Sequence, residues 1–329
     1  MNSRRIAALV GVAATGALLA GCGSGPNQTN AAAIVGDKVI SIDDVQAQMN
    51  TMVDKTPPSQ QTQLDSTTRQ LLTWQVRHQL LTQLAPKLGL SVPDSQVDDA
   101  IKSSGGEQKI AEGTIVDPSM VHQLVADQLL LGKLADKELP GVSVTFDIVK
   151  VSDRTQATEI AQKLAADPAS EPSLLQQMAG QGVPAESNQQ LTGATVASQS
   201  APPQFLAIPA NTAAGVAVPQ QDGSTAWFVV FVHKRTVDAS KQAKDKPTSQ
   251  QLGQLAQFGA PLLSSHAQGV GIKINPRYGA WNALDGAVEA PNSDSASLTI
   301  RPAAVPAIVP TAPRGDRVRQ RRRRAARPH

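Results

Sequence analysis

The stretch 32–52, which reads AAIVGDKVISIDDVQAQMNTM, limits most narrowly what this chain can fold into. Two short runs of apolar, mostly β-branched residues flank the turn pair Gly36-Asp37. Ser41 stands where a helix N-cap belongs, and Asp44 follows three residues later. One buried helix face, with spacings of three and four, is marked by Ile42, Val45, Met49 and Met52. The pattern predicts a short strand, a tight turn and the start of an amphipathic helix.

The motif A-x-I-V-G-D-K-V-I-S-x-x-D-V in this stretch resembles the opening of the SurA N-terminal domain family, also seen in PrsA-type foldases. A second landmark, G-L-S-V-P-D at 89–94, fits the same family and follows in the right order. The resemblance implies an extracytoplasmic chaperone that holds unfolded secreted chains.

Residues 32–140 are predicted to form the first part of a helical chaperone lobe. A long helix is expected from about 60 to 88, with Gly89 as its terminator, and Asp117-Pro118 begins another that ends near 140. His78 and His122 have no second ligand at metal spacing on the same helix face, so no metal site is expected here.

The segment 142–237 resembles a parvulin-type prolyl isomerase domain, with a first strand, two helices and a strongly apolar last strand. Active parvulins carry histidines where this chain has Asp147 and Phe228. The resemblance therefore implies a degenerate isomerase pocket of Asp147, Met178, Phe205 and Phe228 without catalytic residues. Core packing is the alternative role for Met178 and Phe205.

The ending I-N-P-R-Y-G-A-W at 274–281 resembles the V-x-P-R-Y-G-x-W element that closes the lobe in SurA-type and PrsA-type foldases. By that precedent, residues 245–284 complete the lobe and 270–274 pair with 34–35 or 39–40. The expected fold is α+β, a mainly helical, discontinuous lobe closed by a small pair of terminal strands, with an inserted parvulin-like α/β domain.

The first residues have the form of an export signal. Two arginines precede an uncharged apolar run from Ile6 to Ala20, too short to span a bilayer. The run ends in Leu19, Ala20, Gly21 and Cys22, which resembles the bacterial lipobox and implies lipidation of Cys22. Residues 1–21 are then the signal peptide and 22–31 a tether. A plain secretory signal with an incidental cysteine is the alternative.

The charge is unevenly distributed. The formal net charge is +3, but residues 314–329 alone hold eight Arg and one Asp. The rest of the mature chain is acidic, which argues against a nucleic-acid-binding fold. Residues 285–329 are predicted to be a disordered tail with an Arg-rich end.

These observations predict a membrane-anchored, extracytoplasmic chaperone without a cofactor, since no phosphate-binding loop is present. Its partners would be unfolded or nascent secreted polypeptides, bound in a cleft between the lobe and the inserted domain. Met49, Met52 and Trp74 are the candidate client-binding residues. The alternatives are an active prolyl isomerase and a solute-binding or envelope-scaffold lipoprotein.

Overall fold

The computed structural model describes residues 30–53, 64–112, 114, 116–198, 201–241, 246–290 and 297–300. The elements in chain order are β1 (Ala31–Val35), β2 (Lys38–Ser41), α1 (Ile42–Val53), α2 (Leu64–Leu84), α3 (Asp94–Ser103), α4 (Glu107–Glu112), α5 (Val121–Glu138), β3 (Val142–Val151), α6 (Arg154–Ala166), α7 (Glu171–Gly180), β4 (Ala185–Thr192), α8 (Gly193–Ala197), β5 (Thr212–Pro219), β6 (Thr225–Val237), α9 (Ser249–His266), β7 (Ile272–Ile274), β8 (Ala280–Asn282), β9 (Ala287–Glu289) and β10 (Leu298–Ile300).

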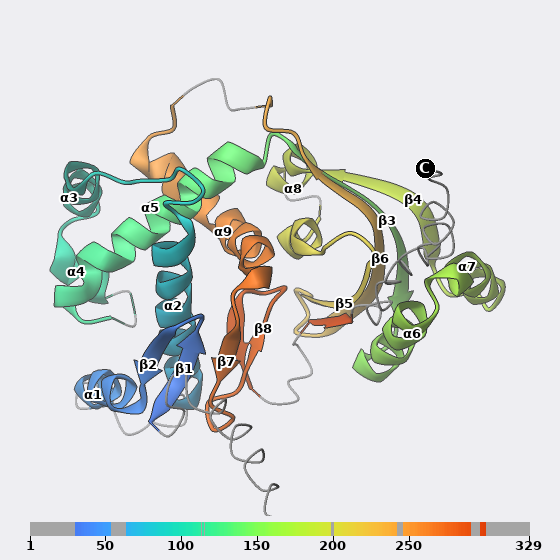
Figure 1. Ribbon diagram of the computed structural model, residues 1–329, viewed down its shortest axis with the longest axis horizontal. Coiled ribbons are helices and arrows are strands. Elements are labelled where there is room, and N and C mark those ends of the chain that lie inside the picture. Colours follow the sequence, from blue (N-terminus) through green and yellow to red (C-terminus); the bar gives the residue numbers. More distant parts are fainter. Residues whose placement is uncertain are drawn as a thin grey trace, which may run out of the picture.

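Two parts stand side by side in Figure 1. We call one the helical lobe; it contains β1, β2, α1–α5, α9 and β7–β9. The other, the sheet domain, contains β3–β6, β10 and α6–α8. The chain enters the sheet domain after α5 and returns to the lobe with α9.

The two ends of the lobe meet in a small sheet of order β2-β1-β7. Strands β1 and β7 are antiparallel, with Ala33 opposite Ile274 and Val35 opposite Ile272. The backbone N–H of Gly36 donates to the carbonyl of Gly271 over 2.8 Å, which extends the ladder by one residue. The strand pairing that the sequence predicts is confirmed in its first alternative, with β1 rather than β2.

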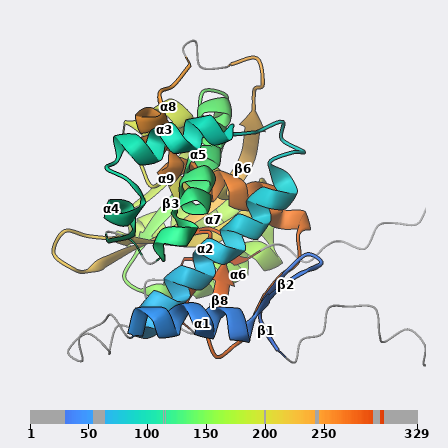
Figure 2. The ribbon, with the colours of Figure 1, turned by 90° about the vertical axis from the view of Figure 1, so that its left-hand side faces the viewer.

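The helices of the lobe follow the signals in the sequence. The Ser41 hydroxyl accepts from the backbone N–H of Asp44 over 3.0 Å and caps α1. Helix α2 begins at Leu64 and ends at Leu84. The helix thus ends four residues before the predicted end near 88, and Gly89 is not its terminator. Gly89 lies five residues beyond the helix in the following turn at φ +64°, the left-handed conformation that favours glycine. In Figure 2, α2 crosses the face of the lobe, with α1 at its lower end.

Helices α5 and α9 approach each other unusually closely. A Cβ built on Gly132 of α5 would lie 2.2 Å from the carbonyl oxygen of Leu252. A Cβ on Gly259 of α9 would lie 2.1 Å from that of Leu131. The helices therefore pack backbone against backbone, which only a residue without a side chain allows.

The sheet domain is built on an antiparallel sheet of order β10-β5-β6-β3-β4. Helices α6 and α7 cover its outer face, on the right in Figure 1, over an apolar layer that includes Ile160, Met178 and Trp227. Its inner face is turned toward α9 and the short 3-10 helix Pro203–Ala207.

One continuous apolar core joins the lobe to this inner face. It runs from α2 and α5 through α9 onto the sheet, and its members include Leu72, Leu134, Leu262, Phe205 and Val230. Arg235 of β6 adds polar links across the junction, to the Leu206 carbonyl at 2.7 Å and the Ser265 hydroxyl at 3.2 Å. Where the sequence analysis expects a client cleft, these residues are packed together.

Strands also occur where the sequence predicts none. Residues 287–289 form β9 and 298–300 form β10, so the prediction of disorder from residue 285 is wrong for these two segments. The lipobox, the tether up to residue 29 and the Arg-rich end all lie outside the described residues. Within the described residues, no helix has the length and apolar character needed to cross a membrane.

Candidate functional site: a cleft between α2, α5 and the β8–β9 hairpin

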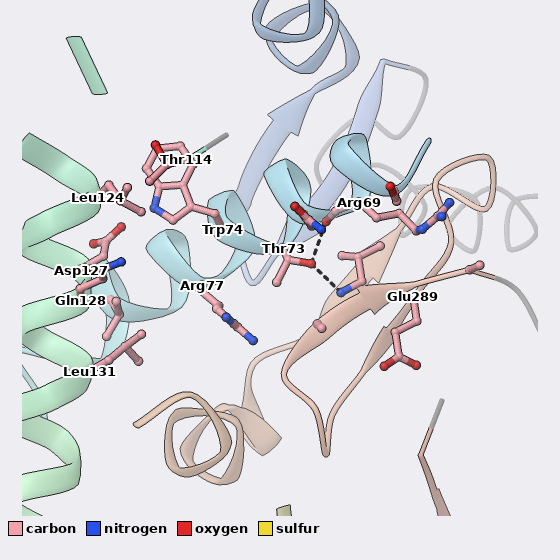
Figure 3. Close-up of a pocket in the computed structure, with 16 residues that line it drawn as sticks. Arg69, Thr73, Trp74, Arg77, Thr114, Leu124, Asp127, Gln128, Leu131 and Glu289 are labelled. Carbon is pink, nitrogen blue, oxygen red and sulfur yellow. Dashed lines mark hydrogen bonds between the residues drawn. The ribbon is translucent and has the colours of Figure 1, made fainter. Parts of the chain in front are cut away.

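A cleft of about 720 Å³ opens within the helical lobe, between α2, α5 and strand β9 (Figure 3). Its apolar lining comes from Trp74, Leu81, Leu124, Leu131 and Val288. Its charged lining comes from Arg69, Arg77, Asp127 and Glu289. We call it the α2–α5 cleft.

The β8–β9 hairpin forms one wall because two residues of α2 hold it in place. Thr73 is buried, and its hydroxyl accepts from the backbone N–H of Val288 over 2.8 Å, one of the dashed lines in Figure 3. Arg77 donates from Nε to the Gly286 carbonyl at 2.7 Å and from Nη2 to the Asp285 carbonyl at 3.2 Å. Residues four apart lie on the same helix face, so one side of α2 fixes the C-terminal hairpin.

The opposite wall is held by a polar contact between helices α2 and α5. His78 Nδ1 of α2 lies 3.0 Å from Asp127 Oδ1 of α5. Burial raises the pKa of Asp127, while its contacts with His78 oppose that rise. The indole Nε1 of Trp74 is buried and makes no well-formed hydrogen bond, but this edge of the ring points toward Asp127 in Figure 3. The nearby indole N–H also opposes the rise in the pKa of Asp127.

Glu289 is the titratable group of the hairpin wall. Burial, together with the nearby Asp285, raises the pKa of Glu289 to about 7, although a hydrogen bond from Asn282 opposes the rise. Asn282 Nδ2 lies 3.0 Å from Glu289 Oε2 and 2.5 Å from Asp285 Oδ2, so one amide holds both carboxyl groups. Near neutral pH the carboxyl group of Glu289 is therefore only partly ionised.

Trp74 also borders a second hollow, of about 340 Å³, on the other side of α2. This hollow is lined by Val39 and Ile40 of β2, Gln48 of α1 and Met120. The strand–turn–helix motif at 32–52 therefore reaches the neighbourhood of the cleft through Trp74.

The arrangement is suited to binding rather than to bond-breaking. Volumes of 300–1,000 Å³ with apolar walls and a few polar groups are typical of ligand pockets. Among the described residues, the group of three metal-ligand side chains that lie together, Asp147, Glu171 and His233, is in the sheet domain and outside the cleft.

The structure separates the three candidate client-binding residues. Trp74 lines the cleft. Met49 is buried in the core, with 8% of its surface exposed. Met52 belongs to α1, but its side chain lies outside the described residues.

The structure also divides the four residues of the degenerate isomerase pocket. Phe205 packs edge-on against Phe146 at a centroid distance of 5.6 Å, on the inner face of the sheet. Phe228 packs against the same core. Met178 lies in the apolar layer beneath α6 and α7, and Asp147 contacts Asn188 and His233. The four side chains therefore do not line one pocket.

Thr73, Arg77 and Asp127 are site residues that the sequence alone did not predict. Asp127 left a signal: it falls at spacings of three and four between Leu124 and Leu131, on the apolar face of its helix. A carboxylate at such a position needs a partner. Arg77 and Thr73 left none, because their partners lie about two hundred residues further along the chain.

A family model described as the SurA-like N-terminal domain matches residues 2–113, about a third of the chain. The match covers α1–α4, including the α2 wall of the cleft, but not α5 or the hairpin. No curated protein and no solved structure matches the chain. The N-terminal third is thus similar to SurA-type domains, and this similarity supports a chaperone-like function.

Proposed function

We propose that the protein is a membrane-anchored, extracytoplasmic holdase that binds unfolded exported polypeptides in the α2–α5 cleft. The observation that carries the proposal is the cleft itself, an apolar hollow with charged residues in its walls. Its α2 wall belongs to the part of the chain that is similar to SurA-type domains. A client segment with an apolar side chain would enter between Trp74 and Leu124.

Binding by apolar burial fits a chaperone because it depends little on sequence. Burying one leucine-sized side chain contributes about 1.5–3 kcal/mol, enough for weak and reversible contact. The Trp74 ring and the leucines supply that surface, while Arg69 and Glu289 offer charges of both signs to the flanking residues of a client. No nucleotide is needed for release when each contact is this weak.

Anchoring through Cys22 is part of the proposal and rests on the lipobox sequence alone. Two or more acyl chains on this cysteine would keep the protein at the membrane. We expect Cys22→Ala to shift the protein from the membrane fraction to the soluble fraction. Retention of the variant with the membrane would contradict the anchor without affecting the cleft.

The sheet domain is proposed to be parvulin-like and without isomerase activity. Isomerisation needs a pocket that binds the twisted imide better than the planar forms. Asp147 and Phe228 stand in place of the two histidines. Asp147 contacts Asn188, whereas Phe228 packs against the apolar core, so the two side chains do not share a pocket. We expect no acceleration of prolyl isomerisation in a model peptide. Acceleration that is lost on substitution of Phe205 would overturn this part.

The central test is suppression of aggregation of a chemically unfolded client by the purified chain. Leu124→Gln places an amide in the cleft wall, and Val237→Gln makes the same kind of change at an exposed valine of β6. We expect Leu124→Gln to weaken client binding about tenfold, as the loss of one buried leucine predicts. The Val237→Gln control should protect as well as the original chain. Equal protection by both variants would show that clients bind elsewhere.

A further inference from the structure

Three side chains with metal-ligand chemistry meet at the five-stranded sheet. Asp147 comes from β3, Glu171 is the first residue of α7, and His233 comes from β6. Their ligand atoms all lie within 4.8 Å of one another. His233 Nε2 is 3.1 Å from Asp147 Oδ1, close to the spacing of two ligands on one ion with bonds of about 2.0–2.2 Å.

The backbone holds Asp147 in position. The β3–β4 register shifts between Phe146 and Ile148, an irregularity of the kind that re-aims a side chain. Opposite this shift, Asn188 adopts φ +55° and donates its backbone N–H to Asp147 Oδ1 over 2.7 Å. Phe231 packs edge-on against the His233 ring at 5.1 Å. Two of the three ligands are therefore oriented before any ion arrives.

The burial of Glu171 indicates that a neutralising positive charge is needed beside the two carboxyl groups. The residue is only 5% exposed, and its Oε1 atom is buried without a hydrogen-bond partner. Asp147 is equally buried. Two facing carboxylates removed from water do not both stay ionised without a neutralising charge. In the protein alone a proton can fill this role, since burial and the neighbouring Asp147 raise the pKa of Glu171 to about 8.

We propose that Asp147, Glu171 and His233 form a binding site for a first-row divalent cation such as Zn²⁺. One imidazole and two carboxylates suit Zn²⁺ or Mn²⁺ better than Mg²⁺ or Ca²⁺, which prefer oxygen ligands alone. The His233 side chain is 34% exposed, so an ion can enter from solvent on that side. Bound there, the ion ties the start of α7 to the two central strands, away from the α2–α5 cleft.

The test is a calorimetric titration of the full-length, chelator-treated chain with Zn²⁺ at neutral pH. We expect one Zn²⁺ to bind, and its affinity to fall at least about tenfold in Glu171→Gln and in His233→Gln. Glu159→Gln, which changes an exposed carboxylate on α6, is the matched control and should bind like the original chain. Thermal unfolding should show a Zn²⁺-dependent rise in Tm that a chelator reverses and that both site variants lack.

His233→Gln is the decisive variant because its partly exposed ring can be replaced without opening the core. Far-UV circular dichroism verifies that each variant is folded. Absence of tight Zn²⁺ binding in the folded chain would overturn the proposal and leave the shared proton as the neutralising charge. Undiminished binding in both Glu171→Gln and His233→Gln would place the ion elsewhere and overturn it equally.

Discussion

At the scale of single residues, Glu289 is the hairpin residue whose protonation depends most clearly on its folded surroundings. Its carboxyl group faces Asn282, Asp285 and, at longer range, Arg154. Asn282 Nδ2 also lies 2.8 Å from the Ser297 carbonyl, so the same amide holds the chain beyond the hairpin. The protonation of Glu289 is therefore linked to the folding of this wall.

This linkage predicts a pH dependence of stability. The pKa of Glu289 rises from 4.5 to about 7 on folding, so the folded chain binds the proton more tightly than the unfolded chain. The free energy of unfolding should therefore fall as pH rises from about 4.5 to about 7 and change no further from this group above that. Glu289→Gln removes this contribution. Between pH 5 and pH 8, we expect the free energy of unfolding to fall by about 1–2 kcal/mol more in the original chain than in the variant. This difference is smaller than a fully buried carboxyl would give, because solvent screens Glu289 in part.

Urea unfolding of both proteins at the two pH values measures the difference. Other acids with raised pKa values, such as Asp127 and Asp136, contribute equally to both proteins and cancel. Glu159→Gln serves as a control at an exposed site. Equal pH slopes for the original chain and Glu289→Gln would show that this carboxyl is already ionised at pH 5 in the folded protein.

Residue roles that depend on near neighbours could be predicted from the sequence, and the others could not. The Ser41 cap and the turn at Gly36 follow from spacing within a few residues. Trp74, a candidate client-binding residue, lines the cleft. Thr73 and Arg77 act on a hairpin far along the chain, and no local pattern carries that information. The roles of Thr73 and Arg77 in holding the cleft wall therefore could not be predicted from the sequence.

At the scale of elements, the contact of α5 with α9 brings the backbones of two helices together. Gly132 faces the α9 backbone, whereas a Cβ on Gly253 of α9 would meet nothing within 4 Å. We expect Gly132→Ala to force the helices apart and lower the free energy of unfolding by about 2–3 kcal/mol. Gly253→Ala should raise it by up to about 1 kcal/mol, because alanine favours the helix and no neighbour is displaced.

Chemical denaturation of the two variants gives the comparison, and the opposite signs separate crowding from helix propensity. A Gly132→Ala protein as stable as Gly253→Ala would mean that the two helices do not pack this closely in solution. Both substitutions add one methyl group to a helix, so the two variants have the same amino-acid composition and the same charge.

The elements with strong periodicity could be predicted, and those without it were missed. Helices α2 and α5 and strands β3 and β6 follow apolar spacing. Strand β4 is polar and exposed along most of its length, so no alternation marks it. Strand β5 is buried along most of its length and contains small residues that a turn would also use. Strands β9 and β10 have only three residues each, too few to show a period.

At the scale of the whole molecule, the lobe depends on residues from both ends of the described chain. Strand β7 pairs with β1, and the hairpin that follows β7 forms a wall of the α2–α5 cleft. This closure was expected from the resemblance of I-N-P-R-Y-G-A-W to a known ending, whereas periodicity predicts only an edge strand there. Without β7, the buried strand β1 would present one unpaired edge and the hairpin would lose its connection.

The closure can be tested by a disulfide between the two strands. Gly36 bonds to Gly271, and Asn275 to Ala32, which makes Ala33 and Ile274 a non-hydrogen-bonded pair with their Cα atoms about 4.5 Å apart. That distance suits a disulfide. In a Cys22→Ser background, Ala33→Cys/Ile274→Cys should cross-link on oxidation and migrate faster on a non-reducing gel. Closing a loop of roughly 240 residues should stabilise the chain by about 2–4 kcal/mol.

The matched control moves one cysteine by two residues along the same face of β7. In Ala33→Cys/Ile272→Cys the two residues are diagonal neighbours, about 7–8 Å apart, too far for a relaxed disulfide. We expect this pair to stay reduced under the same oxidation. Cross-linking of the diagonal pair instead would indicate a two-residue slip in register, which would move the hairpin along α2 and break its bonds to Thr73 and Arg77. If neither pair cross-links, β1 and β7 are not paired in solution. The hairpin that follows β7 would then not form a wall of the cleft on which the proposed function depends.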